Sequence, residues 1–193
     1  MRRLIVAEIL TPRLRLRRWQ PADLDPFAAM NADPRVMEFL PTRLDRSATE
    51  AMVARVDASF DTNGFGLWAV ELREDHSFAG YVGLLRPSFR TRFTPCVEIG
   101  WRLAPEFWGR GYATEGAEAA LRFGFETVGL DEILSWTVPA NVRSRRIMTK
   151  LGMTHDPRDD FDHPLLPEGH PLRRHVLYRI RRPERPESEA VGP

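Results

Sequence analysis

The stretch VEIGWRLAPEFWGRGYATEGAE, residues 97–118, changes from one hydrophobic period to another. Its first part has apolar residues at every second position, the period of a strand with one buried face: Val97, Ile99, Trp101 and Leu103. From residue 112 onward, small and apolar residues recur at helical spacing: Ala113, Gly116, Ala117, Ala120, Leu121 and Gly124. The stretch therefore predicts a strand, a turn containing two glycines, and a helix.

Such a turn can bind phosphate. Gly109 and Gly111 let the backbone turn tightly and leave its N–H groups uncovered. The first N–H groups of the following helix have no internal partner and carry partial positive charge, so we expect a diphosphate site here. The alternative is a purely structural turn, because a lone G-x-G is weak. The dinucleotide pattern G-x-G-x-x-G fails at Thr114, and the phosphate-loop pattern fails because the only lysine is Lys150.

Three separated stretches resemble one family. WGRGYA, residues 108–113, resembles the acetyl-CoA-binding motif Q/R-x-x-G-x-G/A of the GNAT superfamily of N-acetyltransferases, although Trp108 departs from its first position. LTPRLRLRRWQPADLDPF near the start and NVRSRRIMTKLGM farther on are similar to the branch of the ribosomal-protein alanine N-acetyltransferases. The three stretches occur in the order of that family, and the resemblance covers residues 9–180.

The resemblance implies an α/β (α+β) fold. A mixed, mostly antiparallel central sheet would be splayed into a V-shaped cofactor cleft and flanked by helices. A length of 193 residues suits one domain, which we place at residues 1–182. Residues 183–193 are charged and rich in proline, so we expect a flexible tail there.

The amino-acid composition limits the molecules that this protein is expected to bind and the compartment that it is expected to occupy. The formal charge of +1 favours neither nucleic acid nor an anionic membrane, and the arginines between Arg13 and Arg18 mostly alternate along one strand. No apolar run has the length of a membrane span, and no signal-peptide pattern precedes the domain. Cys96 is the only cysteine and is expected to be a small buried residue in a reducing compartment. We therefore expect a cytoplasmic monomer or homodimer.

The first half of the chain predicts a half-buried strand, three helices and a hairpin. The strand contains Leu10, Leu14 and Leu16, and a helix over residues 21–31 becomes regular near residue 25. A short helix with Val36, Met37 and Leu40 follows, and then a helix over residues 47–60, capped by Ser47 with Glu50. The hairpin strands are residues 67–72 and 78–85, where Gly80 and Gly83 indicate a bulge or a close approach.

The second half predicts the central strand and the elements that follow it. The helix after the glycine turn runs to about residue 127, and residues 133–138 form a strand. Residues 141–151 form a helix that ends at Gly152, and the last strands are residues 153–156 and 174–180.

The cofactor contacts are implied by the resemblance. The glycine turn and its neighbours would hold the diphosphate: Trp108, Gly109, Arg110, Gly111, Tyr112, Ala113 and Thr114. Main-chain groups of the central strand, at Trp101 and Leu103, would pair with the pantetheine, and an N–H group of residues 101–103 would face the developing oxyanion. Arginines 143, 145 and 146 could meet the 3′-phosphate, or form a solvated basic face.

The candidate base is Glu98, on the face of the central strand opposite Ile99 and Trp101. Several family members place a catalytic glutamate near this position. Partial burial raises the pKa of a carboxyl group toward the value that a base needs near neutral pH. The alternative is a structural pair with an arginine such as Arg102.

The candidate acid is Ser144. Much of the superfamily uses a tyrosine seven residues after the helix asparagine, where this chain has Met148. The branch it resembles has N-x-x-S, so Asn141 would bond the pantetheine and Ser144 would approach the sulfur. The alternatives are a simple helix cap at Asn141 and an ordinary polar residue at Ser144.

The segment between His155 and His175 holds histidines and acidic residues. Its spacing fits no common zinc pattern, so we expect no metal. Its carboxylates form either a solvated loop or an acidic mouth that attracts a cationic amine: Asp156, Asp159, Asp160, Asp162 and Glu168.

These features predict a transferase of the acyltransferase class: an acetyl-CoA-dependent N-acetyltransferase. It would acetylate a primary amine, of a protein N-terminus or a small molecule, by direct attack in a ternary complex. The alternative is a non-catalytic CoA-binding or regulatory module on the same fold, which Met148 keeps open.

Overall fold

A single mixed sheet organises the chain. The computed structural model describes residues 8–183, and within them nine strands lie in the order β1-β2-β3-β4-β5-β6-β9-β7, with β8 pairing with β9. All neighbours are antiparallel except β5 and β6. The expected mixed, mostly antiparallel sheet is confirmed. The strands are β1 (Ile9–Leu10), β2 (Leu14–Arg17), β3 (Leu67–Leu72), β4 (Phe78–Leu85), β5 (Glu98–Leu103), β6 (Glu132–Thr137), β7 (Thr154–His155), β8 (Phe161–Asp162) and β9 (Arg174–Arg181).

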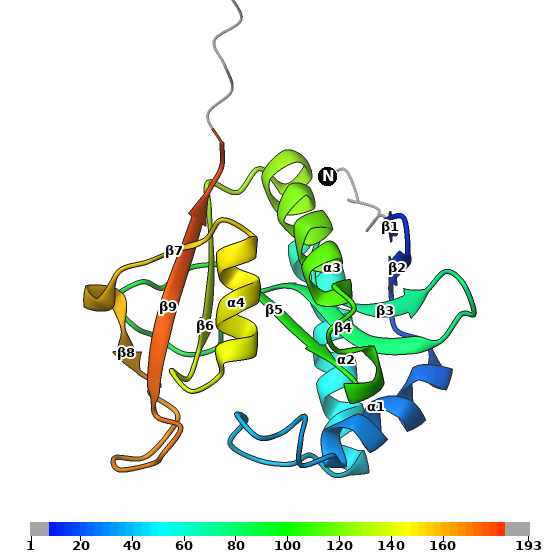
Figure 1. The fold of residues 1–193 in the computed structure, drawn as a ribbon, viewed down its shortest axis with the longest axis horizontal. Helices are drawn as coiled ribbons and strands as arrows, with labels where there is room; N and C mark the ends of the chain where they lie inside the picture. The colour runs from blue at the N-terminus through cyan, green and yellow to red at the C-terminus, as the bar shows by residue number, and fades with distance from the viewer. Residues whose placement is uncertain (1–7, 184–193) are drawn as a thin grey trace, which may run out of the picture.

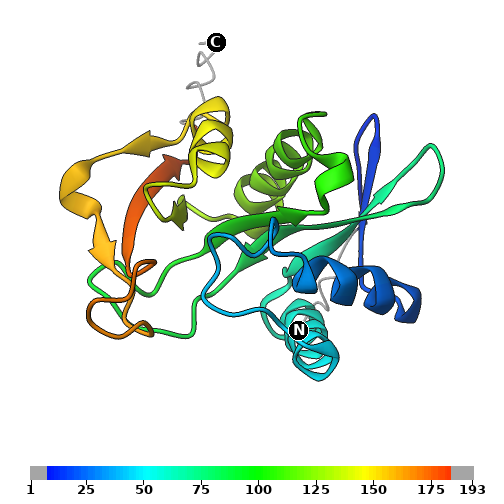
Figure 2. The same cartoon turned by 60° about the horizontal axis from the view of Figure 1, so that its bottom comes forward.

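Helices cover both faces of the sheet. Figure 2 shows α3 and α4 on one face and α1 and α2 on the other. The helices are α1 (Leu24–Ala32), α2 (Arg46–Asn63), α3 (Tyr112–Arg122), which continues as a π-helical segment over Phe123–Val128, and α4 (Val142–Lys150). Within residues 8–183, none of these helices combines the length and the apolarity that crossing a membrane requires.

The small residues of α3 let the helix lie close to the sheet. A Cβ at Gly116 would meet Val82 at 3.3 Å, and one added just after the helix, at Gly124, would meet Ile133 at 2.8 Å. Ala117, Ala119, Ala120 and Leu121 of this helix belong to the main core. A second apolar cluster lies on the other face, where α1 and α2 contribute Phe27, Met30 and Val56.

Two expectations for residues 9–45 are wrong. Leu10 is 61% exposed, because a turn with Thr11 bonded back to Leu14 separates β1 from β2. Residues 33–45 form turns instead of a short helix. Pro34 and Pro41 bracket the apolar residues there and leave too short a stretch for helical bonding.

The cap of α2 also differs from its prediction. The helix begins at Arg46, and the Asp45 carboxylate accepts a hydrogen bond from the Ala48 N–H at 2.7 Å. Ser47 therefore lies in the first turn and not before it. The glycine predictions are confirmed: Gly80 has φ +133° beside a register shift between β3 and β4, and Gly152, with φ +76°, follows α4.

The sheet opens between β5 and β6 (Figure 1). β5 pairs with β4 over six residue pairs, but with β6 only at Glu98 and Leu134. The Leu134 N–H donates to the Val97 carbonyl at 2.9 Å. One step farther, the Ser135 hydroxyl donates to the Ile99 carbonyl at 3.0 Å. Beyond this point the strands diverge, as the predicted V requires.

The domain limits stay predictions. Residues 1–7 and 184–193 lie outside the described residues, so the expected tail at residues 183–193 falls almost wholly beyond them.

Candidate active site

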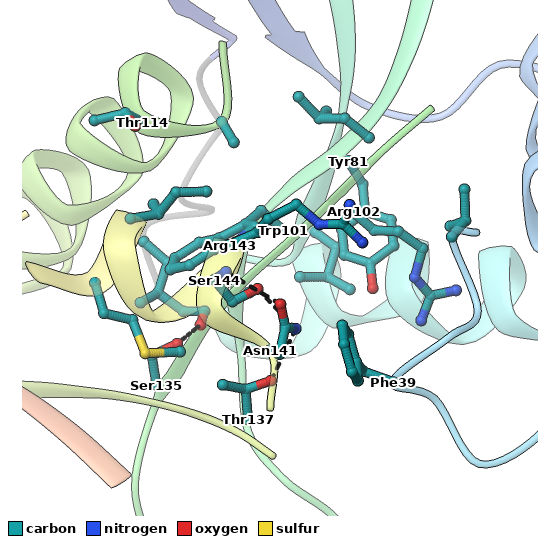
Figure 3. A pocket seen from close by; sticks show the side chains of 18 of the residues that line it. Phe39, Tyr81, Trp101, Arg102, Thr114, Ser135, Thr137, Asn141, Arg143 and Ser144 are labelled. Carbon is teal, nitrogen blue, oxygen red and sulfur yellow. Dashed lines mark hydrogen bonds between the residues drawn. The ribbon is translucent and has the colours of Figure 1, made fainter. Parts of the chain in front are cut away.

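A cavity of about 600 Å³ lies where β5 and β6 diverge. Its wall includes the glycine turn and the start of α4, which belong to one face of the sheet. It also includes Met52 and Val56 of α2 and Phe39 of the 33–45 segment, which belong to the other face. The cavity therefore reaches both faces of the sheet through the gap between the strands, and Figure 3 shows part of its wall.

The glycine turn is open toward this cavity. Gly109 and Gly111 both have positive φ, 73° and 81°. A Cβ at Gly109 would meet no atom within 4 Å, and one at Gly111 would meet only Arg13 Nη2, at 3.4 Å. Gly111 directly precedes α3 and has no side chain to cap it. The first N–H groups of the helix are therefore available to an anion.

Arg13 holds this turn in place from the start of β2. Its Nη1 donates to the Arg110 carbonyl at 2.9 Å, and its Nε donates to Glu115 at 2.6 Å. The guanidinium carbon lies 4.7 Å from the centre of the Tyr112 ring. No local sequence pattern marks this role, because about a hundred residues separate Arg13 from the turn.

Trp108 replaces the Gln or Arg of the motif, and its side chain bonds to the end of β5. Its indole N–H donates to the Leu103 carbonyl at 2.7 Å. The guanidinium of Arg143 lies 4.4 Å from the centre of its ring, and Arg143 also pairs with Glu38 at 3.0 Å. Arg143 thus joins α4, the glycine turn and the 33–45 segment.

Asn141 is fixed at the start of α4 (Figure 3). Its Oδ1 accepts from the Ser144 N–H at 3.2 Å, which confirms the helix cap. Its Nδ2 donates to Thr137 Oγ1 at 3.0 Å and to Ser144 Oγ at 3.1 Å. Because the Ser144 oxygen accepts a bond, its own proton is free to be donated elsewhere.

Glu98 is half-buried in the cavity wall, and burial raises its pKa to about 8. Within residues 8–183, no ion pair or hydrogen bond involves its side chain. The alternative of a pair with Arg102 is wrong, because Arg102 Nη1 donates to Asn31 Oδ1 at 2.7 Å. Four residues along a strand also place the two Cα atoms about 13 Å apart.

The structure gathers nearly all the predicted site residues. The cavity wall contains Glu98, Trp101, Leu103, Trp108, Gly109, Gly111, Tyr112, Ala113, Thr114, Asn141 and Ser144. Arg110 is the exception: it is exposed outside this wall. Arg145 also turns away, toward Tyr178 Oη and the Pro139 carbonyl.

The acidic segment after α4 lies apart from this cavity. None of its carboxylates belongs to the wall. The four aspartates instead pair with basic side chains: Asp156 with Arg158, Asp159 with Arg179, Asp160 with His155, and Asp162 with Arg173 and Arg174. No group of three or more metal-ligating side chains is found in the part of the chain that the structure describes.

Several wall residues escaped the sequence analysis. Tyr81 and Phe39 belong to the cavity wall. The sequence indicated only a hairpin strand around Tyr81 and a short helix around Phe39. Tyr81 could be found only from the strand register, which sets it opposite Arg102. Ser135 gave a weak signal, as a polar residue inside an otherwise apolar strand.

Comparisons with known proteins agree with this geometry. Residues 13–154 match the acetyltransferase (GNAT) domain family. This chain belongs to that family. It is 34% identical over 135 residues to the FsC-acetyl coenzyme A-N(2)-transacetylase of Aspergillus fumigatus, an alignment that covers 65% of this chain and 56% of the fungal one.

Solved structures of acetyltransferases share the fold. An acetyltransferase from Agrobacterium tumefaciens superposes with a TM-score of 0.72 at 28% identity, over 90% of this chain and 94% of that one. The ribosomal-protein-S5-alanine acetyltransferase of Vibrio fischeri gives 0.72 at 15% identity, over 91% and 97%. The expected family and acetyltransferase class are confirmed, and acetyl-CoA is the co-substrate of this family.

Proposed function

We propose that this GNAT protein transfers the acetyl group of acetyl-CoA to a primary amine, by direct attack in a ternary complex. The observation that carries the proposal is the cavity that crosses the sheet between β5 and β6. Because it reaches both faces, a cofactor and an acceptor can enter from opposite faces and meet at β5. Alignment of the two reactants then supplies much of the rate.

The residues on the α3 and α4 face fit acetyl-CoA. The open glycine turn presents N–H groups to the diphosphate, and a Cβ at Gly109 would occupy that space. Arg143, Arg146 and Lys150 lie in the wall near the start and along the length of α4, where they can meet the remaining phosphate. The amide of Asn141 and the unpaired edge of β5 suit the pantetheine.

The chemistry needs one proton removed and one supplied. Acetyl-CoA supplies the thioester carbonyl; the amine nitrogen bonds to its carbon as the C–S bond breaks. Glu98, directly or through water, takes the proton that the amine loses, and a main-chain N–H group of Trp101 or Leu103 faces the charge on the carbonyl oxygen. Ser144 gives its hydroxyl proton to the departing sulfur and regains one from solvent.

We place the protein in the cytoplasm, as a monomer or homodimer that acts on a protein N-terminus or a small amine. The arginines in and just before β2 support an acceptor other than nucleic acid, because Arg13, Arg15 and Arg17 are each paired with carboxylates. A non-catalytic CoA-binding module remains the second candidate, because Met148, 1% exposed, replaces the usual tyrosine.

The test of cofactor binding is Gly111→Val. A β-branched side chain at φ +81° strains the turn and covers its N–H groups, so calorimetry should detect no acetyl-CoA binding. Gly129→Val is the matched control, since Gly129 also has φ +81° and open space but lies outside the cavity wall. A folded Gly111→Val protein with unchanged affinity would overturn the proposed cofactor site.

Thiol release with a panel of amines separates the enzyme from the module. The proposed enzyme releases CoA at a rate that rises with the concentration of an acceptor amine. A protein that binds acetyl-CoA tightly and releases no thiol with any amine is the module.

A further inference from the structure

The cavity wall contains far more basic than acidic side chains. Among residues 8–183, its only carboxylate is Glu98, whereas its basic side chains are Arg35, Arg55, Arg102, Arg143, Arg146 and Lys150. The last three lie on α4, beside the proposed CoA site, and Arg143 also reaches Glu38 of the 33–45 segment. The first three line the opposite part of the wall, where the acceptor would bind.

Arg102 differs from the other two: Arg35 pairs with Asp33 and Arg55 is exposed, whereas Arg102 is half-buried and is held only by neutral partners. Its Nη1 donates to Asn31 Oδ1 at 2.7 Å and lies 3.9 Å from the Met37 sulfur, and its guanidinium lies 5.3 Å from the centre of the Tyr81 ring. All three partners are neutral. Within residues 8–183, no carboxylate pairs with Arg102.

The position of Arg102 is fixed by its surroundings. Asn31 is fully buried and donates in turn to Thr49 Oγ1 at 3.1 Å, so the amide that holds the guanidinium is itself held. The bond to Asn31 uses one of the five N–H donors of the guanidinium. A planar edge remains that matches the two oxygens of a carboxylate.

Glu98 and Arg102 share one face of β5 with Gly100 between them. A Cβ at Gly100 would meet only Leu85, at 3.9 Å, so the strand leaves open space between the two side chains. Their Cα atoms are about 13 Å apart at the usual rise of a strand. The long side chains span much of this distance, and a small molecule that carries both an amine and an anion fits the rest.

The wall around this space is apolar. In Figure 3, Phe39, Tyr81 and Arg102 lie to the right of Ser135 and Thr137. Other apolar side chains in this part of the wall belong to the 33–45 segment, α2 and β3: Val36, Leu40, Met52, Val56 and Leu67. A hydrocarbon body would be desolvated here, whereas a polycation would meet the charge of Arg102.

We propose that the acceptor is a small amino acid with an apolar body, whose carboxylate binds Arg102 while its amine lies beside Glu98. This inference rests on the proposed acetyl transfer. It makes Arg102 a specificity-determining residue. Of the two alternatives for the acidic segment it favours the solvated loop over a mouth that attracts a cationic amine, since those aspartates are paired and lie outside the wall.

The test compares leucine with leucinamide, and phenylalanine with its amide, as acceptors. Amidation also lowers the pKa of the amine, so the diagnostic quantity is the acid-to-amide ratio of kcat/KM compared between variants. Arg102→Gln should lower this ratio about 10- to 100-fold, the loss of a charged hydrogen bond. Arg90→Gln is the matched control: Arg90 is exposed outside the wall, and its loss should leave the ratio unchanged.

Arg102→Lys keeps the charge and loses the two-point contact, so its ratio should fall between those of wild type and Arg102→Gln. If circular dichroism shows that Arg102→Gln is unfolded, Arg102→Lys takes its place in the test. An unchanged ratio in a folded Arg102 variant would overturn the inference. So would a wild-type preference for an amidated peptide beginning with alanine, the mimic of a protein N-terminus, over both amino acids.

Failure of the proposed function has a different signature. If wild type binds acetyl-CoA and releases no thiol with any acceptor, acetyl transfer is refuted. Calorimetry with leucine and leucinamide in the presence of CoA then tests the Arg102 site alone. Tighter binding of leucine, lost in Arg102→Gln, would support the site, and equal binding of the two would overturn it.

Discussion

The two edges of β5 differ in how they are paired. Along β4, all six residues of β5 have register partners. Along β6, one pair and one side-chain bond from Ser135 hold the strands together before they separate. The same six residues thus serve stability on one edge, while the other borders the cavity.

This difference explains where side chains are tolerated. Beside the β4 edge, a Cβ at Gly80 would lie 2.1 Å from the Arg102 carbonyl oxygen, so the backbones are in direct contact there. On β5 itself, a Cβ at Gly100 would point into the open space between Glu98 and Arg102, where the acceptor is proposed to bind. A side chain added beside the paired edge should therefore disturb folding, whereas one added at Gly100 should disturb acceptor binding.

The largest effect should separate these two glycines. Gly80→Ala meets backbone at 2.1 Å with φ +133°, so we expect a loss of more than about 3 kcal/mol in the free energy of unfolding. Gly100→Ala should change that free energy by less than about 1 kcal/mol but raise KM for the acceptor. Urea denaturation and steady-state kinetics measure the two quantities. Equal stability losses would show that the two sites are not distinct.

Glu98→Gln should have the next largest effect. The base acts only when ionised, and its pKa is raised to about 8, so wild-type kcat/KM should climb with pH up to about 8 and then level. The variant should be about 100-fold slower on this plateau and should lack the climb. A pH–rate profile that matches wild type would make Glu98 structural.

The same raised pKa gives Glu98 a signature in stability. Between its ordinary pKa of 4.5 and about 8, the folded protein holds a proton that the unfolded chain has lost. The contribution of Glu98 to stability is therefore complete below 4.5 and is lost as the pH rises through this window. Glu98→Gln should remove that part of the slope from a plot of unfolding free energy against pH.

Ser144→Ala should give the smallest effect on the reaction. CoA is a fair leaving group, so we expect kcat to fall by about 10- to 100-fold, at the low end of general acid catalysis. Asn141→Ala should instead raise KM for acetyl-CoA. The lost cap and hydrogen bond should weaken the free energy of cofactor binding by about 1 to 2 kcal/mol. If Ser144→Ala is as fast as wild type, water protonates the sulfur.

Much of the fold could be predicted because its signals are local. The change of period around Gly109 and Gly111 gave the strand, the turn and the helix, and Asn141 was recognisable as a cap. The cap of α2 was misplaced because Asp45 and Ser47 both precede suitable partners, and only the backbone decides between them.

The parts that could not be predicted depend on long-range contacts. Arg13 reaches the glycine turn, and Arg102 reaches Asn31, across about seventy residues or more of intervening sequence. A sequence with many arginines does not show which of them have acidic partners. The distinction between structural arginines and the uncompensated Arg102 therefore had to come from the structure.

The Ser135 bond also has a consequence for solvent access along β5. Because the Val97 and Ile99 carbonyls face β6, the alternation of a strand turns the Trp101 N–H toward the same side, past the last bond between the two strands. The Gly100 and Arg102 N–H groups face β4. Deuterium should therefore replace the Trp101 proton quickly and its two neighbours slowly, and a bound pantetheine that pairs with this edge should make the three amides exchange alike.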